Sequence, residues 1–145
     1  MTPSPDPIPV VGALRHHVAR VVLGLGLAGA GTAHLTSSRV EFRAQVPTWL
    51  PLDPDLVVVV SGVVEIVLGV ALIVVTRRRS LVGWAAAAFF VAIFPGNIAQ
   101  YTEQRDAFGL DSDTERLVRL FFQPVLVAWA LWATGARWSW RQRSG

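Results

Sequence analysis

Long stretches without charge constrain this chain more than any other feature of its sequence. Charged residues are absent from residues 21–38, 80–102 and 120–136, and Glu65 alone interrupts residues 56–76. A bilayer core about 30 Å thick needs about 20 apolar residues per helix. We therefore predict an all-α chain, a four-helix transmembrane bundle with spans near residues 14–36, 56–76, 80–101 and 117–136.

The composition agrees with a membrane protein and excludes several classes of site. Mean hydropathy is +0.47, and charged residues make up 16%, against about 25% in soluble domains. The absence of cysteine excludes disulfides, thiolate metal sites and a dithiol relay within the chain. All 13 basic residues are arginine. Because a compositional bias of the source explains this, the high pI does not indicate a nucleic-acid partner.

Arginines are distributed unevenly over the predicted loops. The N-terminal segment, the turn after the second span and the C-terminal tail hold eight arginines and one acid, whereas the other two loops hold five arginines and eight acids. Because arginine-rich loops near span ends resist translocation, both termini are predicted to be cytoplasmic. Trp132, Trp138 and Trp140 would form an aromatic belt there, with Trp49 at the outer interface. The predicted location is the bacterial cytoplasmic membrane.

The two ends of the chain are predicted to be tails. Residues 1–13 contain four prolines, which favours a disordered segment, and residues 137–145 form a basic cytoplasmic tail after the membrane domain of residues 14–136. Residues 15–33 could instead be a cleaved signal peptide, with a charged start and an apolar centre. That centre is rich in glycine, and cleavage would leave three spans whose charges fit the orientation less well.

Glu65 is the most informative single residue. It lies on one helical stripe with Gly62 and Gly69, so its side chain is predicted to point into the bundle. Counted from Leu56 at about 1.5 Å per residue, it lies roughly 13 Å below the outer boundary. An acid at that depth costs a few kcal/mol unless it is paired or protonated, so a functional role is the default interpretation. The alternative is a neutral acid that hydrogen-bonds a neighbouring helix.

Four further polar side chains fall in the outer half of the predicted bundle: His34, Asn97, Arg119 and Gln123. His34 lies on the small-residue stripe of the first span. Arg119 and Gln123 share a stripe of the fourth span, from which Arg119 could reach Glu65 directly or through Gln123. One polar pocket open to the outside would accommodate all five. Taken singly, Asn97 and Gln123 are also explained by interhelical hydrogen bonds, and His34 by a helix end.

Pro95 interrupts the third predicted span two residues before Asn97. Proline lacks the N–H of a normal helix residue and clashes with the preceding turn, so it frees carbonyl groups near Val91. In a membrane such groups must find donors inside the protein. We expect a kink there, with Asn97 and Gln100 near it.

The histidines do not predict a haem or a metal site. His16 and His17 lie about 25 Å along the helix from His34, so one haem could not use both positions. His34 and Glu65 together supply only two ligands, too few to favour a metal. No cofactor is firmly implied, although the headgroup of a quinone would suit the predicted pocket.

Several short segments occur in a recognisable order. They are GTAH at 31–34, VPTWLP at 46–51, SGVVEI at 61–66, FPGN at 94–97 and the stretch from Arg119 to Pro124. With these segments the sequence resembles the DoxX family of small four-span bacterial membrane proteins. That resemblance implies a four-helix membrane bundle and an association with redox complexes, including a thiosulfate:quinone oxidoreductase. It implies no catalytic residue.

Three functions remain open from the sequence. The first is an accessory, redox-associated membrane subunit that is not an enzyme on its own. In it Glu65 would exchange protons, His34 and Asn97 would hydrogen-bond a small ligand, and Arg119 would tune the acid. The second is a structural anchor or assembly factor whose polar residues only fix helix packing. The third is a small proton-coupled carrier, which with four spans would need to form a homo-oligomer.

Overall fold

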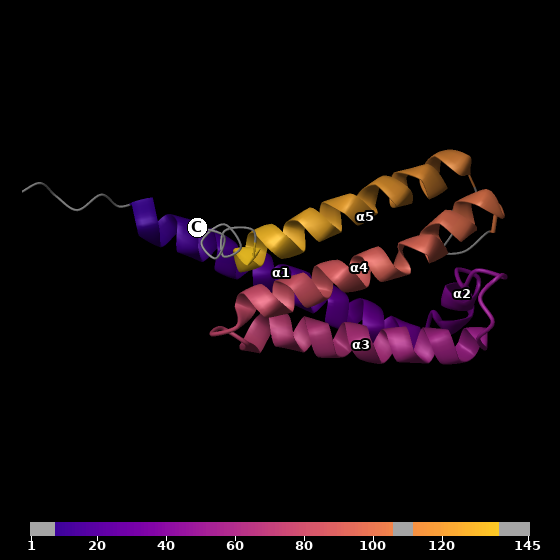
Figure 1. Cartoon of the computed structure of the whole chain (residues 1–145), viewed down its shortest axis with the longest axis horizontal. Helices are drawn as coiled ribbons and strands as arrows, with labels where there is room; N and C mark the ends of the chain where they lie inside the picture. Colours follow the sequence, from indigo (N-terminus) through magenta and orange to yellow (C-terminus); the bar gives the residue numbers. More distant parts are fainter. Residues whose placement is uncertain (1–7, 106–111, 137–145) are drawn as a thin grey trace, which may run out of the picture.

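The structure is a computed structural model that describes residues 8–105 and 112–136. Its elements, in chain order, are α1 (Ile8–Leu35), α2 (Arg39–Arg43), α3 (Pro54–Val74), α4 (Arg79–Thr102) and α5 (Asp113–Thr134). The four long helices run side by side, and the short α2 lies at one end of them (Figure 1). The prediction of an all-α chain with four long apolar helices is confirmed.

All four long helices are long and apolar enough to cross a membrane, the first counted over Val11–Leu35. Their ends lie within four residues of the predicted spans. The helix α1 itself begins at Ile8, so residues 8–13, predicted as part of a disordered tail, are helical. Residues 1–7 and the basic tail at 137–145, with its two tryptophans, lie outside the described residues.

Local signals set the helix ends. The Asp53 carboxylate accepts hydrogen bonds from the N–H groups of Asp55 and Leu56 and caps the start of α3. Ser112 and Glu115 form a reciprocal capping box at the start of α5. Gly135 ends α5 with a φ of 68°, a left-handed conformation that glycine adopts without a steric penalty.

Two helix pairs make up the bundle, α1 with α3 and α4 with α5, while α3 and α4 contact each other little. In the first pair the backbones touch. A Cβ atom at Gly69 would lie 2.5 Å from the carbonyl oxygen of Gly24, and one at Gly31 would overlap the carbonyl of Gly62. In the second pair, Gly83 leaves room for the Thr134 side chain. Such close approach between small residues is how helices associate in lipid.

The outward faces of the helices are apolar. On α3, Val60, Val67 and Val74 are each more than half exposed, and Val91 on α4 and Phe121 on α5 are exposed as well. Contiguous apolar surface of this kind is suited to lipid rather than water. The helices therefore present the surface expected of a multi-pass membrane protein in contact with a bilayer.

Candidate functional site

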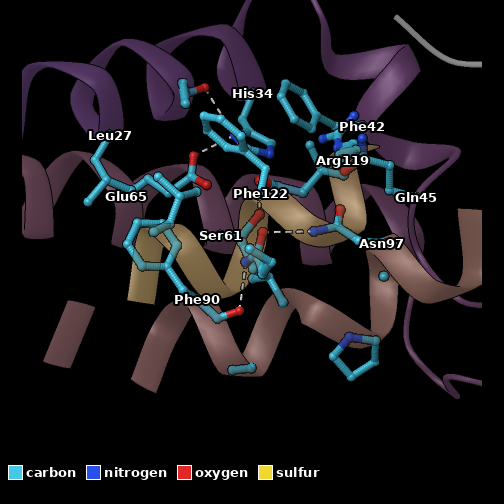
Figure 2. A pocket seen from close by; sticks show the side chains of 18 of the residues that line it. Leu27, His34, Phe42, Gln45, Ser61, Glu65, Phe90, Asn97, Arg119 and Phe122 are labelled. Carbon is cyan, nitrogen blue, oxygen red and sulfur yellow. Dashed lines mark hydrogen bonds and ion pairs between the residues drawn. The ribbon is translucent and has the colours of Figure 1, made fainter. Parts of the chain in front are cut away.

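A cavity of about 620 Å³ lies between the two helix pairs. All four long helices and the loop between α1 and α3 line it. Its apolar walls include Leu27, Phe90 and Leu126. All five residues singled out in the sequence line it too: His34, Glu65, Asn97, Arg119 and Gln123. The structure thus brings the five together, and Figure 2 shows four of them, His34, Glu65, Asn97 and Arg119, around one space. Their role as a ligand site stays a prediction.

Glu65 and His34 form the centre of the polar lining. Both are buried, at 5% and 7% exposure, and Glu65 Oε2 lies 2.7 Å from His34 Nδ1. The same nitrogen lies 3.0 Å from the carbonyl oxygen of Ala30. Because a carbonyl can only accept, Nδ1 is the nitrogen that carries a proton.

The angles at His34 Nδ1 decide whether the Ala30 carbonyl or the Glu65 carboxylate accepts its hydrogen bond. Only the contact with Ala30 has the angle of a hydrogen bond, and Glu65 Oε2 has no hydrogen-bond partner among the described residues. The 2.7 Å approach is therefore an electrostatic contact rather than a satisfied hydrogen bond. A buried carboxylate oxygen with unused acceptor capacity is costly for a folded protein, and a ligand hydroxyl or an added proton would relieve that cost.

The position of Glu65 depends on the glycine contacts between α1 and α3. A Cβ atom at Gly31 would lie 2.9 Å from the Cβ of Glu65, and one at Gly62 would lie 2.8 Å from the Cβ of His34. Because Gly31 and Gly62 have no side chain, the backbones that carry His34 and Glu65 lie in direct contact. The small-residue stripe predicted from the sequence therefore sets the distance between the acid and the imidazole.

Asn97 and Gln123 join α4 to α5 on the other side of the cavity. Asn97 Nδ2 donates to Gln123 Oε1 at 2.9 Å, and Gln123 Nε2 donates to the carbonyl oxygen of Phe90 at 2.7 Å. Phe90 lies in the turn before Pro95, where freed carbonyl groups were expected. The carbonyl that Pro95 leaves without its helical N–H is that of Val91, so Gln123 reaches the neighbouring carbonyl, and these bonds of Gln123 go to α4 rather than to Glu65.

Arg119 lies one helical turn before Gln123 and lines the same cavity from α5. In Figure 2 it is drawn on the side of the pocket where Phe42 and Gln45 lie, away from Glu65. A guanidinium group presents several N–H donors in a fixed plane. The cavity therefore has a basic donor at one part of its lining and an acid with a free acceptor at another.

The loop between α1 and α3 covers the polar end of the cavity. The Phe42 ring stacks on the His34 ring with centroids 3.4 Å apart, and Gln45 lines the cavity with a side-chain nitrogen that has no hydrogen-bond partner in the described residues. Gly96 lets this loop approach α4, because a Cβ atom there would lie 3.0 Å from the Gln45 carbonyl oxygen.

Ion pairs hold this loop in place. The Arg105 guanidinium donates to the carbonyl oxygens of Ala44 and Val46 at 2.9 and 3.1 Å and pairs with Glu103 at 2.6 Å. Arg39 Nε donates to Asp55 Oδ1 at 2.8 Å, and this bond raises the pKa of the Arg39 guanidinium above its usual range. The cover is thus fastened to α4 on one side and to α3 on the other.

Phe42 and Gln45 were not singled out in the sequence. Phe42 lies in the short α2 and Gln45 in the loop after it. In such segments there is no helical periodicity and no polar residue inside a span from which a site residue could be predicted. Only the contacts of the folded loop place them over His34 and beside Asn97.

Within residues 8–105 and 112–136, no three His, Asp or Glu side chains are grouped so that they could hold a metal ion. His34 and Glu65 thus stand as a pair. The arrangement can donate and accept hydrogen bonds and can take up a proton at Glu65. It is suited to bind a molecule that carries both acceptor and donor groups on a largely apolar body.

Comparison with known proteins identifies a family without a function. A family model described as "Domain of unknown function (DUF8561)" matches residues 23–134, and the chain belongs to this family. No curated protein and no solved structure matches the chain. The matching model provides no link to the DoxX family, so that resemblance stays a prediction from the sequence.

Proposed function

We propose that this DUF8561 protein is a multi-pass protein of the bacterial cytoplasmic membrane that binds a small amphiphilic ligand, with a headgroup of the quinone type, in the cavity between its helix pairs. The observation that carries the proposal is the buried Glu65 Oε2, which has no hydrogen-bond partner in the part of the chain that the structure describes and lies in a largely apolar cavity. Unsatisfied buried acceptors are rare in folded proteins, and they cluster at functional sites.

The proposed ligand follows from the groups that line the cavity. A quinone carbonyl can accept from Arg119 or Gln45, and the hydroxyl of the reduced quinol can donate to Glu65 Oε2. Phe42, Phe90 and the other apolar side chains suit the planar ring. In this proposal Glu65 is the group that takes up or releases the proton, and His34 lies beside it, with Nδ1 2.7 Å from Glu65 Oε2.

The proposed orientation rests on the arginine distribution. Arg77 and Arg78 lie in the turn between α3 and α4, at the end of the bundle opposite α2. Under the positive-inside rule this end faces the cytoplasm, as would both termini. The cavity, with Glu65 and the covering loop, then lies in the outer half of the membrane.

We further propose that the protein is an accessory subunit that works with a redox partner, as its resemblance to the DoxX family implies. Such a subunit would hold the quinone while the partner exchanges electrons with it. The reaction would then belong to the complex rather than to this chain alone.

The second candidate is a structural anchor. The observation that favours it is the bond from Asn97 to Gln123, which satisfies both side chains within the protein and ties α4 to α5. It accounts for these two residues but does not explain why the buried Glu65 Oε2 has no hydrogen-bond partner among the described residues. The two functions differ in what the loss of Glu65 does.

The test is a binding experiment with Glu65→Gln. Wild-type protein in detergent is heated in a calorimeter with and without decylubiquinone. A ligand that binds the folded protein raises Tm, because the stabilisation grows with the logarithm of the ratio of ligand concentration to Kd. We expect a shift for the wild type and none for Glu65→Gln, whose unliganded Tm stays close to that of the wild type because the shape is kept. Glu115→Gln, which keeps the capping box and lies away from the cavity, is the matched control and keeps the shift.

Two results would count against the proposal. An equal shift in Glu65→Gln would show that the acid takes no part in binding. If Glu65→Gln no longer folds, and no benzoquinone or naphthoquinone shifts the Tm of the wild type, the structural anchor is favoured.

A further inference from the structure

The cavity is not closed toward the lipid. Between α1 and α5 its lining includes Val22 and Phe122, which are 49% and 55% exposed, and Gly26, which is exposed as well. A Cβ atom at Gly26 would meet nothing within 4 Å. The wall of the cavity therefore has an apolar opening between α1 and α5, at the level of the membrane interior.

A second hollow continues from this opening along the same two helices. It is lined by Leu14, Arg15, Val18, Ala19, Val22, Trp129 and Trp132. Val22 and Trp129 also line the main cavity, so the two hollows meet at these two side chains. With the exception of Arg15, at the far end, every side chain of the second hollow has a largely apolar body.

The combined path is long enough for a headgroup followed by an extended hydrocarbon tail. From His34 to Leu14, α1 advances 20 positions, which is about 30 Å at 1.5 Å per residue. That matches the thickness of the hydrocarbon core. The polar groups lie at the two ends of this path, Glu65 and Asn97 at one and Arg15 at the other, and the middle is apolar.

We propose that the ligand is a long-tailed amphiphile that enters from the bilayer between α1 and α5, with its head at Glu65 and His34 and its tail in the groove from Gly26 to Leu14. This proposal rests on the proposed function and adds the tail, the route of entry and the helices that form it. The tail buries apolar surface against Val18, Val22 and Trp129, and each buried methylene group adds to the affinity.

The two exposed glycines of α1 provide a matched pair of variants. Gly26 lines the cavity at its opening, whereas Gly29 is exposed, does not line the cavity, and likewise would have nothing within 4 Å of an added Cβ. Gly26→Leu places an isobutyl group in the path of the tail, and its Cβ meets nothing within 4 Å. Gly29→Leu makes the same chemical change one turn away, with the same gain in helix propensity.

The experiment measures binding by quenching of tryptophan fluorescence in lipid nanodiscs. The two probes are decylubiquinone and the same dimethoxy-methyl benzoquinone without its decyl chain. We expect the wild type and Gly29→Leu to bind decylubiquinone more tightly than the short probe by about tenfold or more. Gly26→Leu should lose that preference and still bind the short probe as the wild type does, because the polar end is untouched.

Each contrary outcome is distinct. If the wild type binds both quinones equally, or if Gly26→Leu binds decylubiquinone as Gly29→Leu does, the tail groove is wrong, and the proposed headgroup site stands. If the wild type binds neither probe, the quinone site is wrong, and the tail groove falls with it. Equal quenching in all variants, with no saturation, would show only partition of the probes into lipid and would overturn the proposal.

Discussion

Two regions of the bundle pack in opposite ways. One is the close contact between α1 and α3, called the seam here, and the other is the gap between the two helix pairs. At the seam, glycines bring two backbones into contact, and there is no space for a Cβ atom at Gly31 or Gly69. Across the gap, α3 and α4 meet little, and a cavity of about 620 Å³ remains. Glu65 belongs to both, because its backbone lies at the seam and its carboxylate faces the gap. The rigid side of the molecule thus positions the acid, and the open side leaves room for something to bind it.

The strongest way to break this contrast is to place bulk in the seam. Gly31→Leu would force α1 away from α3, because its Cβ would overlap the Gly62 carbonyl, a backbone atom that cannot turn aside. Overpacking typically costs about 1–3 kcal/mol, and here we expect at least the upper end. Chemical denaturation in detergent micelles measures the loss. Gly29→Leu, on the exposed face of the same helix, should leave stability nearly unchanged, and equal losses in the two variants would contradict the account.

The second prediction concerns the open side, where Gln123 bridges α4 and α5. Gln123→Leu removes the acceptor of the buried Asn97 Nδ2 and a donor to the Phe90 carbonyl. We expect a loss of about 1–3 kcal/mol in the free energy of unfolding. The double variant Asn97→Leu/Gln123→Leu should lose less than the sum of the two single variants. Additive losses would show that the two side chains act independently.

The smallest expected effect is at the cover of the cavity. Arg105→Gln removes the ion pair with Glu103 and weakens the hold on the carbonyl groups of Ala44 and Val46. Because this arginine is partly exposed, the global loss should be below about 1 kcal/mol. Amide hydrogen exchange should nevertheless rise in residues 42–50 and not in α3. Unchanged exchange in that loop would mean that Arg105 does not fasten it.

The sequence predicted the helices well because their signals are local. Charge-free stretches and a helical stripe of small residues are enough to locate four apolar helices and to turn His34 and Glu65 inward. The depth of a polar residue along its helix also placed four side chains in the outer half of the bundle, above or beside Glu65, and the structure gathers all five around one cavity. These inferences need only the rise per residue and the cost of a buried charge.

Contacts between distant segments could not be predicted in the same way. Nothing in the pattern of residues 36–53 indicates that Phe42 stacks on His34, since this contact depends on how Arg39 and Arg105 fasten the loop. Periodicity also suggested Gln123 as a link from Arg119 to Glu65, whereas its bonds run to Asn97 and the Phe90 carbonyl. The start of α1 at Ile8 differs from prediction because prolines near a helix start are compatible with its first turn.

The most direct test of the central claim is to ask what leaves the membrane with the protein. Wild type and Glu65→Gln are purified in native lipid with a membrane-solubilising copolymer, and bound lipid-soluble molecules are extracted and quantified by mass spectrometry. The account predicts a long-tailed molecule with carbonyl or hydroxyl groups on its head, near one per wild-type chain and depleted in Glu65→Gln. The same molecules in the same amounts in both proteins would contradict it.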